Sequence, residues 1–468
     1  MSDNNDEPRV RGLRHMAADP QVLARERETL EALANENIGT RFKGYFALSG
    51  PGWLQSAFTL GGGSAVASLY LGAHYGYELM WVQPLAMTVG IIMLAACAHQ
   101  TLSTGIRPFA AMSRFIHPGV AWAWALATLV SSWVFHLPQY SLAAGVTEDI
   151  TTLVTGWSPQ GAARTAYLLT IGAVILAIST AITWNYGRGI RGIRLYERTL
   201  KVFIALIIVA FGLVVARGAA SGTIDWGALA RGFVPTSLPS DAQGVTTVMG
   251  AFGAAVGINM TFLFGYSLLA RGWGTAHRGL ARFDLVTGML LPYAVVTSLI
   301  IIAAASTIHG TEFAPQQILP ANAGVLIGSS GVGEFTGRVV FALGILGMAL
   351  STITLQMIVA GFVVCELFGW DAQGPRFRWA CLVPAPAVVG VVLWETMGTW
   401  VALPAFTIGL IMLPIAYIGW FVLQNSDGLL GEHRPRGASA VRWNVAMSVA
   451  LAVTLVSVGY TLWTRFLA

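Results

Sequence analysis

Long apolar runs, separated by short polar breaks, dominate the chain after about residue 45. A run of about 18 or more apolar residues is long enough to cross a lipid bilayer as an α-helix. The pattern predicts about eleven such spans. They lie at residues 46–73, 79–99, 119–145, 164–184, 200–217, 244–270, 285–308, 336–367, 378–396, 400–423 and 441–464. We therefore expect an all-α integral membrane protein.

Residues 1–44 are polar and contain no apolar stretch of the kind that a signal peptide needs. We expect them to form a largely flexible cytoplasmic tail, with at most a short surface helix within residues 19–37. No long polar segment divides the remainder of the chain. Residues 45–468 are therefore predicted to form one transmembrane domain.

Composition agrees with a membrane protein. Hydrophobic residues make up 55% of the chain and charged residues 10%, with a mean hydropathy of +0.66, whereas soluble domains carry about 25% charged residues. The isoelectric point near 9.2 needs no nucleic-acid partner, because basic residues gather on the cytoplasmic side of membrane proteins. The cysteines Cys97, Cys365 and Cys381 lie in or beside apolar runs, so neither a disulfide framework nor a cysteine metal site is expected.

The basic residues also predict an orientation. When the N-terminus is placed in the cytoplasm, most basic residues fall on the inner side, including the arginine-rich loop at 188–198. Those left on the outer side are Arg164, Arg217, Arg231, Arg338 and Arg465. This asymmetry predicts a multi-pass protein of the inner or plasma membrane with a cytoplasmic N-terminus.

Three consecutive glycines, Gly61, Gly62 and Gly63, lie near the middle of the first span. Each costs about 1 kcal/mol relative to alanine in a helix interior, which indicates an interrupted helix. Non-helical backbone at membrane depth is tolerated only where it is buried in protein or lines a cavity, and secondary transporters bind substrates at such breaks. Close helix packing through small residues explains the same glycines, so both interpretations remain open.

The sixth span has a matching feature, because Gly253 and Gly257 precede a polar cluster at residues 259–261. Two glycine-interrupted spans, five apart in order, are typical of inverted five-helix repeats with a transport site at their centre. Packing through glycine remains the alternative. We predict that substrate binds at Gly61, Gly62, Gly63, Ser64, Gly257, Asn259, Met260 and Thr261.

Three stretches carry a family resemblance. They are GPGWLQSAFTLGGGSAVASLYLGAHYGYELMWV, the Ser-Thr-Ile-Thr sequence at Ser351–Thr354, and GAAVG before Asn259. They resemble the first span, the eighth-span signature and the sixth-span lead-in of the natural resistance-associated macrophage protein (Nramp) family of divalent-metal transporters. The resemblance covers nearly the whole chain from about residue 40. It implies the leucine-transporter (LeuT) fold with alternating access, in which repeat one is about 46–217, repeat two about 244–423, and 441–464 is an extra span.

The resemblance does not extend to the family's metal ligands. Where the family carries Asp-Pro-Gly-Asn, this chain has Gly61 to Ser64, and the family's Met-Pro-His falls on Gly257 to Asn259. Phe135 to Tyr140 occupy the third-span positions where the family has proton-pathway acids. The acids near membrane level lie at predicted span ends or in loops: Glu78, Glu148, Asp149, Asp284, Glu312, Glu334, Glu366 and Glu395. We expect no central carboxylate, so the metal ligands stay unassigned.

The resemblance implies a secondary transporter for divalent metal ions such as Mn²⁺ or Mg²⁺. Hard dications usually bind one or two carboxylates, so an ion here would have to keep most of its hydration shell. Free N–H groups at a half-helix N-terminus suit an anion instead, which makes a small organic solute, such as an amino acid or a carboxylate, the alternative substrate. A non-transporting sensor on the same fold is the third interpretation.

His136 lies in the third span beside Pro138, Gln139 and Tyr140. It is a candidate proton relay, although a hydrogen-bonded structural role explains it as well. No P-loop or GxSxG motif occurs, so we expect neither an enzyme nor a cofactor. The expected partners are the transported ion or solute and the lipid bilayer. The oligomeric state stays open, with a monomer as the default.

Overall fold

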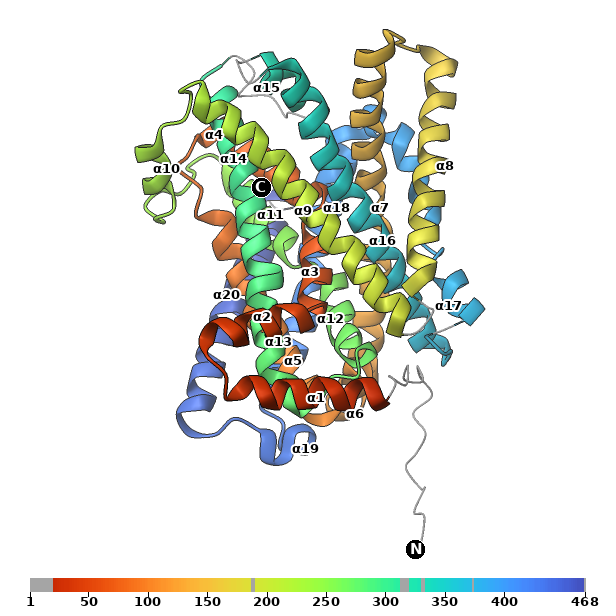
Figure 1. The fold of residues 1–468 in the computed structure, drawn as a ribbon, viewed down its shortest axis with the longest axis vertical. Helices are drawn as coiled ribbons and strands as arrows, with labels where there is room; N and C mark the ends of the chain where they lie inside the picture. Colours follow the sequence, from red (N-terminus) through yellow and green to blue (C-terminus); the bar gives the residue numbers. More distant parts are fainter. Residues whose placement is uncertain (1–19, 187–189, 312–319, 330–332, 373, 467–468) are drawn as a thin grey trace, which may run out of the picture.

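The computed structural model describes residues 20–186, 190–311, 320–329, 333–372 and 374–466, and no strand occurs within these ranges (Figure 1). The α-helices are α1 (Pro20–Ala34), α2 (Ile38–Leu48), α3 (Pro51–Thr59), α4 (Gly62–Tyr75), α5 (Val82–Thr104), α6 (Pro108–Phe115), α7 (Pro118–Thr155), α8 (Gly161–Tyr186), α9 (Ile190–Ala220), α10 (Trp226–Gly232), α11 (Ala242–Ala255), α12 (Ile258–Ala270), α13 (Arg278–Leu285), α14 (Leu291–Thr307), α15 (Pro320–Ile327), α16 (Phe341–Phe368), α17 (Gly374–Ala380), α18 (Gly390–Gln424), α19 (Asp427–Leu430) and α20 (Gly437–Phe466). Short π-helical turns extend α14 and α16 at their starts.

The described helices account for the predicted spans. Nine segments are long and apolar enough to cross a membrane, and the bent pair Ile408–Gln424 with Asp427–His433 adds a tenth. The first predicted span is formed by α3 and α4, which follow each other with a short break and contain 9 and 14 residues. The protein is therefore an all-α, multi-pass membrane protein.

The predicted break between spans 378–396 and 400–423 is wrong. α18 runs without interruption from Gly390 to Gln424, and the chain turns earlier, where Pro384 and Pro386 lie. Proline lacks the backbone N–H that continues a helix. The isolated Gly398 costs only about 1 kcal/mol in a helix, which is too little to end one.

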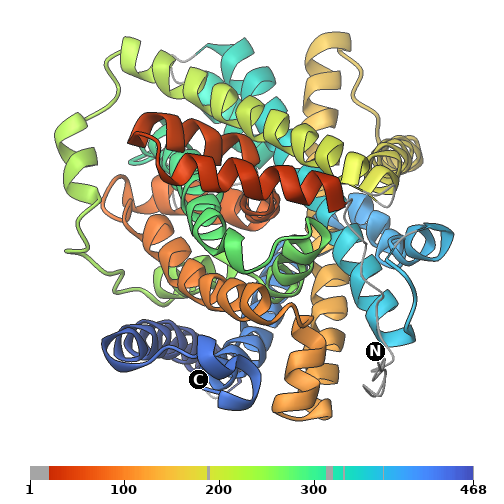
Figure 2. The same cartoon turned by 60° about the horizontal axis from the view of Figure 1, so that its bottom comes forward.

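The tail expected before residue 45 is helical in the part that the structure describes, and α1 lies within residues 19–37, where a short surface helix was expected. α1 and α2 lie across one end of the bundle (Figure 2). α1 buries Leu30 and Leu33, and Asn37 begins α2 by accepting a hydrogen bond from the Thr40 N–H at 2.9 Å. An asparagine at this position satisfies a helix N–H that would otherwise lack a partner. Residues 1–19 of the predicted tail lie outside the described residues.

The bundle is organised around α16. In the most apolar 18 residues of the span that contains α16, 94% of the residues are buried, whereas the corresponding value for α8 is 22%. α16 packs against α7, α9 and α3, so one central helix contacts both the first, interrupted span and the helices around it. This arrangement places polar side chains of α16 beside the helix breaks.

Candidate substrate site

Both predicted helix interruptions are present. α3 ends at Thr59 and α4 begins at Gly62, so the first break consists of Leu60 and Gly61. The second break lies at 256–257, between α11 and α12. The Thr59 hydroxyl donates to the Ala255 carbonyl at 2.7 Å, and this hydrogen bond joins the two breaks directly.

Gly61 in the first break and Gly62 at the start of α4 are closely approached by neighbouring side chains. A Cβ atom on Gly61 would lie 2.6 Å from Oγ1 of Thr352, and one on Gly62 would lie 2.2 Å from Cδ1 of Leu142. Neither glycine has a positive φ. The tight packing of α16 and α7 against the start of α4 therefore explains why side chains are absent here.

A cavity of about 40 Å³ lies at the two breaks, and we call it the central cavity. Its lining residues come from both interrupted spans, α7 and α16: Phe58, Thr59, Gly61, Gly63, Ser64, Phe135, Gln139, Gly253, Gly257, Asn259, Met260, Thr352 and Gln356. A water molecule needs roughly 10–15 Å³ of such volume. In this conformation the central cavity has room for only a few waters.

The structure brings most of the predicted site residues together at the central cavity, but not all of them. Gly62 is absent from the lining, and its N–H donates to Oε1 of Gln139 at 2.9 Å. Thr261 is also absent, and its hydroxyl accepts a hydrogen bond from Nε1 of Trp124 at 3.0 Å. Both residues lie on helix faces that pack against α7. The sequence alone does not show which face of a helix points toward a neighbour. The others line the cavity: Gly61, Gly63, Ser64, Gly257, Asn259 and Met260.

Oxygen-bearing side chains of α7 and α16 complete the central cavity, and among them Gln139 and Thr352 were not assigned to it from the sequence. Gln139 follows Phe135 by four residues on α7, and Gln356 follows Thr352 by four residues on α16. Residues four apart share one helix face. Buried polar residues at this spacing, inside otherwise apolar spans, were the signal that could have identified them.

His136 lies behind the lining rather than in it. Its Nδ1 atom is 2.6 Å from Oε1 of Gln356, so the ring donates to the glutamine. Its Nε2 atom is buried and has no partner among the described residues. The proton-relay role predicted for His136 stays a prediction.

Hydroxyl groups satisfy the carbonyls that the first break leaves without helical partners. Ser351 donates to the Ala57 carbonyl at 2.9 Å and Ser64 to the Thr59 carbonyl at 2.7 Å, while the Thr352 hydroxyl is shared between the carbonyls of Met348 at 2.9 Å and Phe58 at 3.3 Å. The last carbonyls of any helix lack intrahelical donors. The Thr59 carbonyl accepts from both the Ser64 hydroxyl and the Gly61 N–H, which occupies both of its lone pairs, so it could become a ligand only after exchanging a partner.

None of the described side chains that line the central cavity is charged. Within the described part of the chain, no group of three or more His, Cys, Asp or Glu side chains is placed to hold a metal ion. Described acids pair elsewhere: Glu148 with Arg164, Asp149 with Arg338, and Glu366 with Arg107. Glu312 and the side chain of Glu395 lie outside the described part. The available cavity ligands are therefore neutral oxygens and the Met260 thioether.

Comparison with known families identifies the chain. The family described as natural resistance-associated macrophage protein-like matches residues 52–464. The chain belongs to this family. An Nramp relative from Brucella suis, the divalent metal cation transporter MntH, is 25% identical over 89% of this chain and 88% of its own length. The metal transporter Nramp4 of Arabidopsis thaliana is 24% identical over 87% of this chain and 78% of its own length.

Solved structures confirm the fold predicted for this Nramp chain. The manganese transporter of Eremococcus coleocola superposes with a TM-score of 0.70 at 12% identity, covering 92% of this chain and 90% of that one. MhsT in complex with L-phenylalanine gives a TM-score of 0.54 at 14% identity, covering 85% and 98%. Identities this low show the fold alone. The LeuT-type fold, with interrupted first and sixth spans, is therefore established.

Proposed function

We propose that the protein is a secondary transporter that moves a divalent metal ion such as Mn²⁺ or Mg²⁺ across the membrane by alternating access, with the central cavity as its substrate site. The observation that carries this proposal is the position of the cavity, at two helix breaks that a hydrogen bond from Thr59 to Ala255 joins. The curated relatives are named as divalent metal cation transporters, which supports the same substrate class.

The chemistry of the central cavity favours weak binding of a partly hydrated ion. Thr59, Ser64 and Thr352 offer hydroxyl oxygens, and Gln139, Asn259 and Gln356 offer amide oxygens. Mg²⁺ usually keeps several waters and binds through few protein ligands. Complete dehydration beside neutral ligands would be very costly. We therefore expect low affinity, suited to an ion that is abundant, and a conformation wider than 40 Å³ when the ion enters.

A small organic solute is the second candidate, favoured by the uncharged lining. Phe58, Phe135 and Met260 give the central cavity apolar walls beside its amide and hydroxyl groups. Apolar walls with a few well-placed polar groups are typical of sites for small organic molecules. The N–H groups at the start of α4 and α12 would suit a carboxylate on such a molecule.

We further propose the arrangement of the chain in the membrane. Two inverted five-helix repeats, at about 46–217 and 244–423, would carry the two breaks, and span 441–464 would lie outside the repeats. The N-terminus would be cytoplasmic in an inner or plasma membrane. Arg191, Arg194 and Arg198 at the start of α9 support this orientation, because basic residues concentrate on the cytoplasmic side.

Ion uptake into proteoliposomes tests the proposed function. Uptake of Mn²⁺ and Mg²⁺ by liposomes that hold the purified protein is compared with protein-free liposomes, while the internal pH is followed. Saturable, protein-dependent flux of either ion is the expected result. No proton signal is expected, because none of the described lining residues carries an acid. Absence of both fluxes would reject a metal substrate, and stabilisation by amino acids or small carboxylates in a thermal-shift screen would then support the organic solute.

A further inference from the structure

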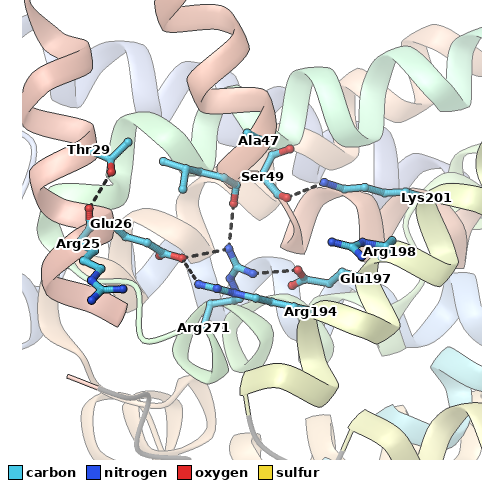
Figure 3. A pocket seen from close by; sticks show the side chains of 11 residues that line it. Arg25, Glu26, Thr29, Ala47, Ser49, Arg194, Glu197, Arg198, Lys201 and Arg271 are labelled. Atoms are coloured by element: carbon cyan, nitrogen blue, oxygen red, sulfur yellow. Dashed lines mark hydrogen bonds and ion pairs between the residues drawn. The ribbon is translucent and has the colours of Figure 1, made fainter. Parts of the chain in front are cut away.

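A second cavity shares no lining residue with the central cavity. It has a volume of about 470 Å³ and lies between α1, α2, α9 and the residue that follows α12. We call it the basic cavity (Figure 3). Its lining residues are Arg25, Glu26, Thr29, Ala47, Leu48, Ser49, Arg194, Glu197, Arg198, Lys201 and Arg271. Its volume lies within the range of roughly 300–1,000 Å³ that is usual for ligand pockets.

Positive charge exceeds negative charge in the basic cavity. Among the described lining residues, five basic side chains face two carboxylates, those of Glu26 and Glu197, which leaves three positive charges in excess in this part of the chain. Asp284, which does not line the cavity, accepts hydrogen bonds from the backbone N–H groups of Gly52 at 2.6 Å and Gly50 at 3.3 Å. A cavity with this charge balance favours an anionic ligand.

Two of the basic residues are held by the carboxylates. Oε1 of Glu26 lies 2.6 Å from Arg194 and 3.6 Å from Arg271. Arg271 also donates to Glu197 at 3.0 Å and to the Leu48 carbonyl at 3.0 Å. Figure 3 shows its guanidinium between these groups. Arg271 is only 5% exposed, and its Nε atom has no partner among the described residues, so the cavity contains a buried donor that is still available.

The remaining arginines have free guanidinium groups. Arg25 on α1 and Arg198 on α9 are exposed, and the described part of the chain offers neither an ion-pair partner. Lys201 donates to the Ser49 carbonyl at 2.8 Å, which leaves two of its N–H groups. Planar guanidinium groups match the geometry of phosphate oxygens and bind them with paired hydrogen bonds. A phosphate group is therefore the anion that this lining fits best.

The surface beside the basic cavity indicates where the phosphate comes from. On α2, Ile38, Phe42 and Phe46 are 82%, 50% and 41% exposed, and their spacing of four places them on one helix face. Phe46 lies at the cavity edge, with the Lys201 ammonium 5.8 Å above its ring. An exposed apolar helix face beside basic side chains is typical of a helix that lies in the membrane interface.

We propose that the basic cavity binds the phosphate group of an anionic membrane lipid, whose acyl chains lie along the exposed face of α2. The lipid joins α1 and α2 to α9, in addition to the Glu26 ion pairs. This binding site does not depend on which substrate the central cavity carries, and it is tested without measuring transport.

The test uses the full-length protein in detergent and measures lipid binding by native mass spectrometry. The probes are dioctanoyl phosphatidic acid, dioctanoyl phosphatidylcholine and inorganic phosphate. The test variant is Arg25→Gln with Arg198→Gln, because neither side chain takes part in an ion pair. The control is Arg191→Gln with Arg436→Gln, which removes the same charge from two exposed arginines outside the cavity.

The expected result is preferential binding of phosphatidic acid over phosphatidylcholine, weakened about tenfold in the test variant and unchanged in the control. Equal loss in both variants would overturn the site, because it would show attraction by net charge alone. Displacement of phosphatidic acid by inorganic phosphate at equal concentration would overturn the lipid assignment, since it would show that acyl chains contribute nothing.

A substitution of opposite effect sharpens the test. Glu26→Gln keeps the shape of the side chain but removes a carboxylate that competes for Arg194 and Arg271. Phosphatidic acid should therefore bind several-fold more tightly to this variant. If Glu26, Arg194 and Arg271 have only a structural role, phosphatidic acid should bind this variant more weakly or not at all. That outcome would contradict the proposal.

Discussion

The central cavity and the basic cavity differ in the charge of their lining and in how far their polar groups are already hydrogen-bonded. The described lining of the central cavity carries no charge, and hydroxyls of the protein bond to carbonyls freed by the first helix break. In the basic cavity, basic side chains outnumber carboxylates among the described residues, and two guanidinium groups have no ion-pair partner there. The comparison shows that the strong electrostatic fields of this chain lie outside its proposed transport site.

The largest expected effect concerns the buried ion pairs of the basic cavity. Arg271→Met should lower the free energy of unfolding by about 3–5 kcal/mol, because Glu197 and Glu26 are left buried with too little positive charge. Thermal unfolding in detergent measures this loss. Arg434→Gln, which removes an exposed pair with Asp427, is the control and should cost less than about 1 kcal/mol. Similar melting temperatures for the two variants would show that the buried pairs contribute no more than exposed ones.

The next effect concerns the close packing at the central cavity. Gly62→Leu should reduce uptake about five- to a hundredfold, since overpacking against Leu142 costs about 1–3 kcal/mol in at least one conformation. The protein should remain folded. Gly250→Leu is the control, because a Cβ atom at Gly250 meets no neighbour within 4 Å. Unchanged uptake by the Gly62 variant would show that the close packing of α4 against α7 beside the central cavity does not limit transport.

Adding a negative charge to the central cavity tests most directly whether its uncharged lining determines what it binds. Gln139→Glu keeps an oxygen for the Gly62 N–H and introduces the carboxylate that the described lining lacks. Divalent ions should bind about tenfold more tightly, because hydrogen bonds and contacts to charged oxygens are stronger. Gln139→Met is the neutral control. If the glutamate leaves ion affinity unchanged while weakening binding of an organic acid, the organic solute becomes the favoured substrate.

The smallest effect concerns a contact outside both cavities. The Tyr75 hydroxyl donates to Asp241 at 2.5 Å, and this bond, followed by the Gly244 N–H, lowers the pKa of Asp241. A carboxyl whose pKa falls on folding stabilises the protein above its unfolded pKa of about 3.9 and loses that effect as the pH falls through its folded pKa. Tyr75→Phe should therefore cost less than about 1 kcal/mol at neutral pH, and nothing in strong acid. A cost that is equal at both pH values would exclude the titration of Asp241 as its cause.

The fold was largely predictable from the sequence, because apolar length and glycine position are local signals. The runs of apolar residues located the spans, and Gly61 and Gly257 marked the two breaks. The helix break that was predicted around Gly398, and that the structure does not contain, shows where such local signals fail. One glycine weakens a helix by too little to end it. The chain turns at 381–384, beside Pro384 and Pro386, yet Pro404 and Pro414 lie within α18, so proline alone does not locate a helix end either.

The site was predictable only in part, because its lining depends on helix phase and tertiary packing. Six predicted residues line the central cavity, but Gly62 and Thr261 face α7 instead. Thr59, Gln139 and Thr352 were missed, since nothing local distinguishes a cavity-facing polar side chain from one that bonds a neighbouring helix. The basic cavity was beyond prediction, because it joins α1, α9 and Arg271, which are far apart in the chain.

Because hydroxyl groups already bond to the carbonyls at the first helix break, an ion that binds there must exchange places with them. An ion that takes the Thr59 carbonyl must first displace the Ser64 hydroxyl, which then bonds to another group or to water. The number of bonds changes little in such a substitution, so the net gain in free energy is small. A site built this way releases its cargo as readily as it accepts it, and it favours rapid turnover over tight capture.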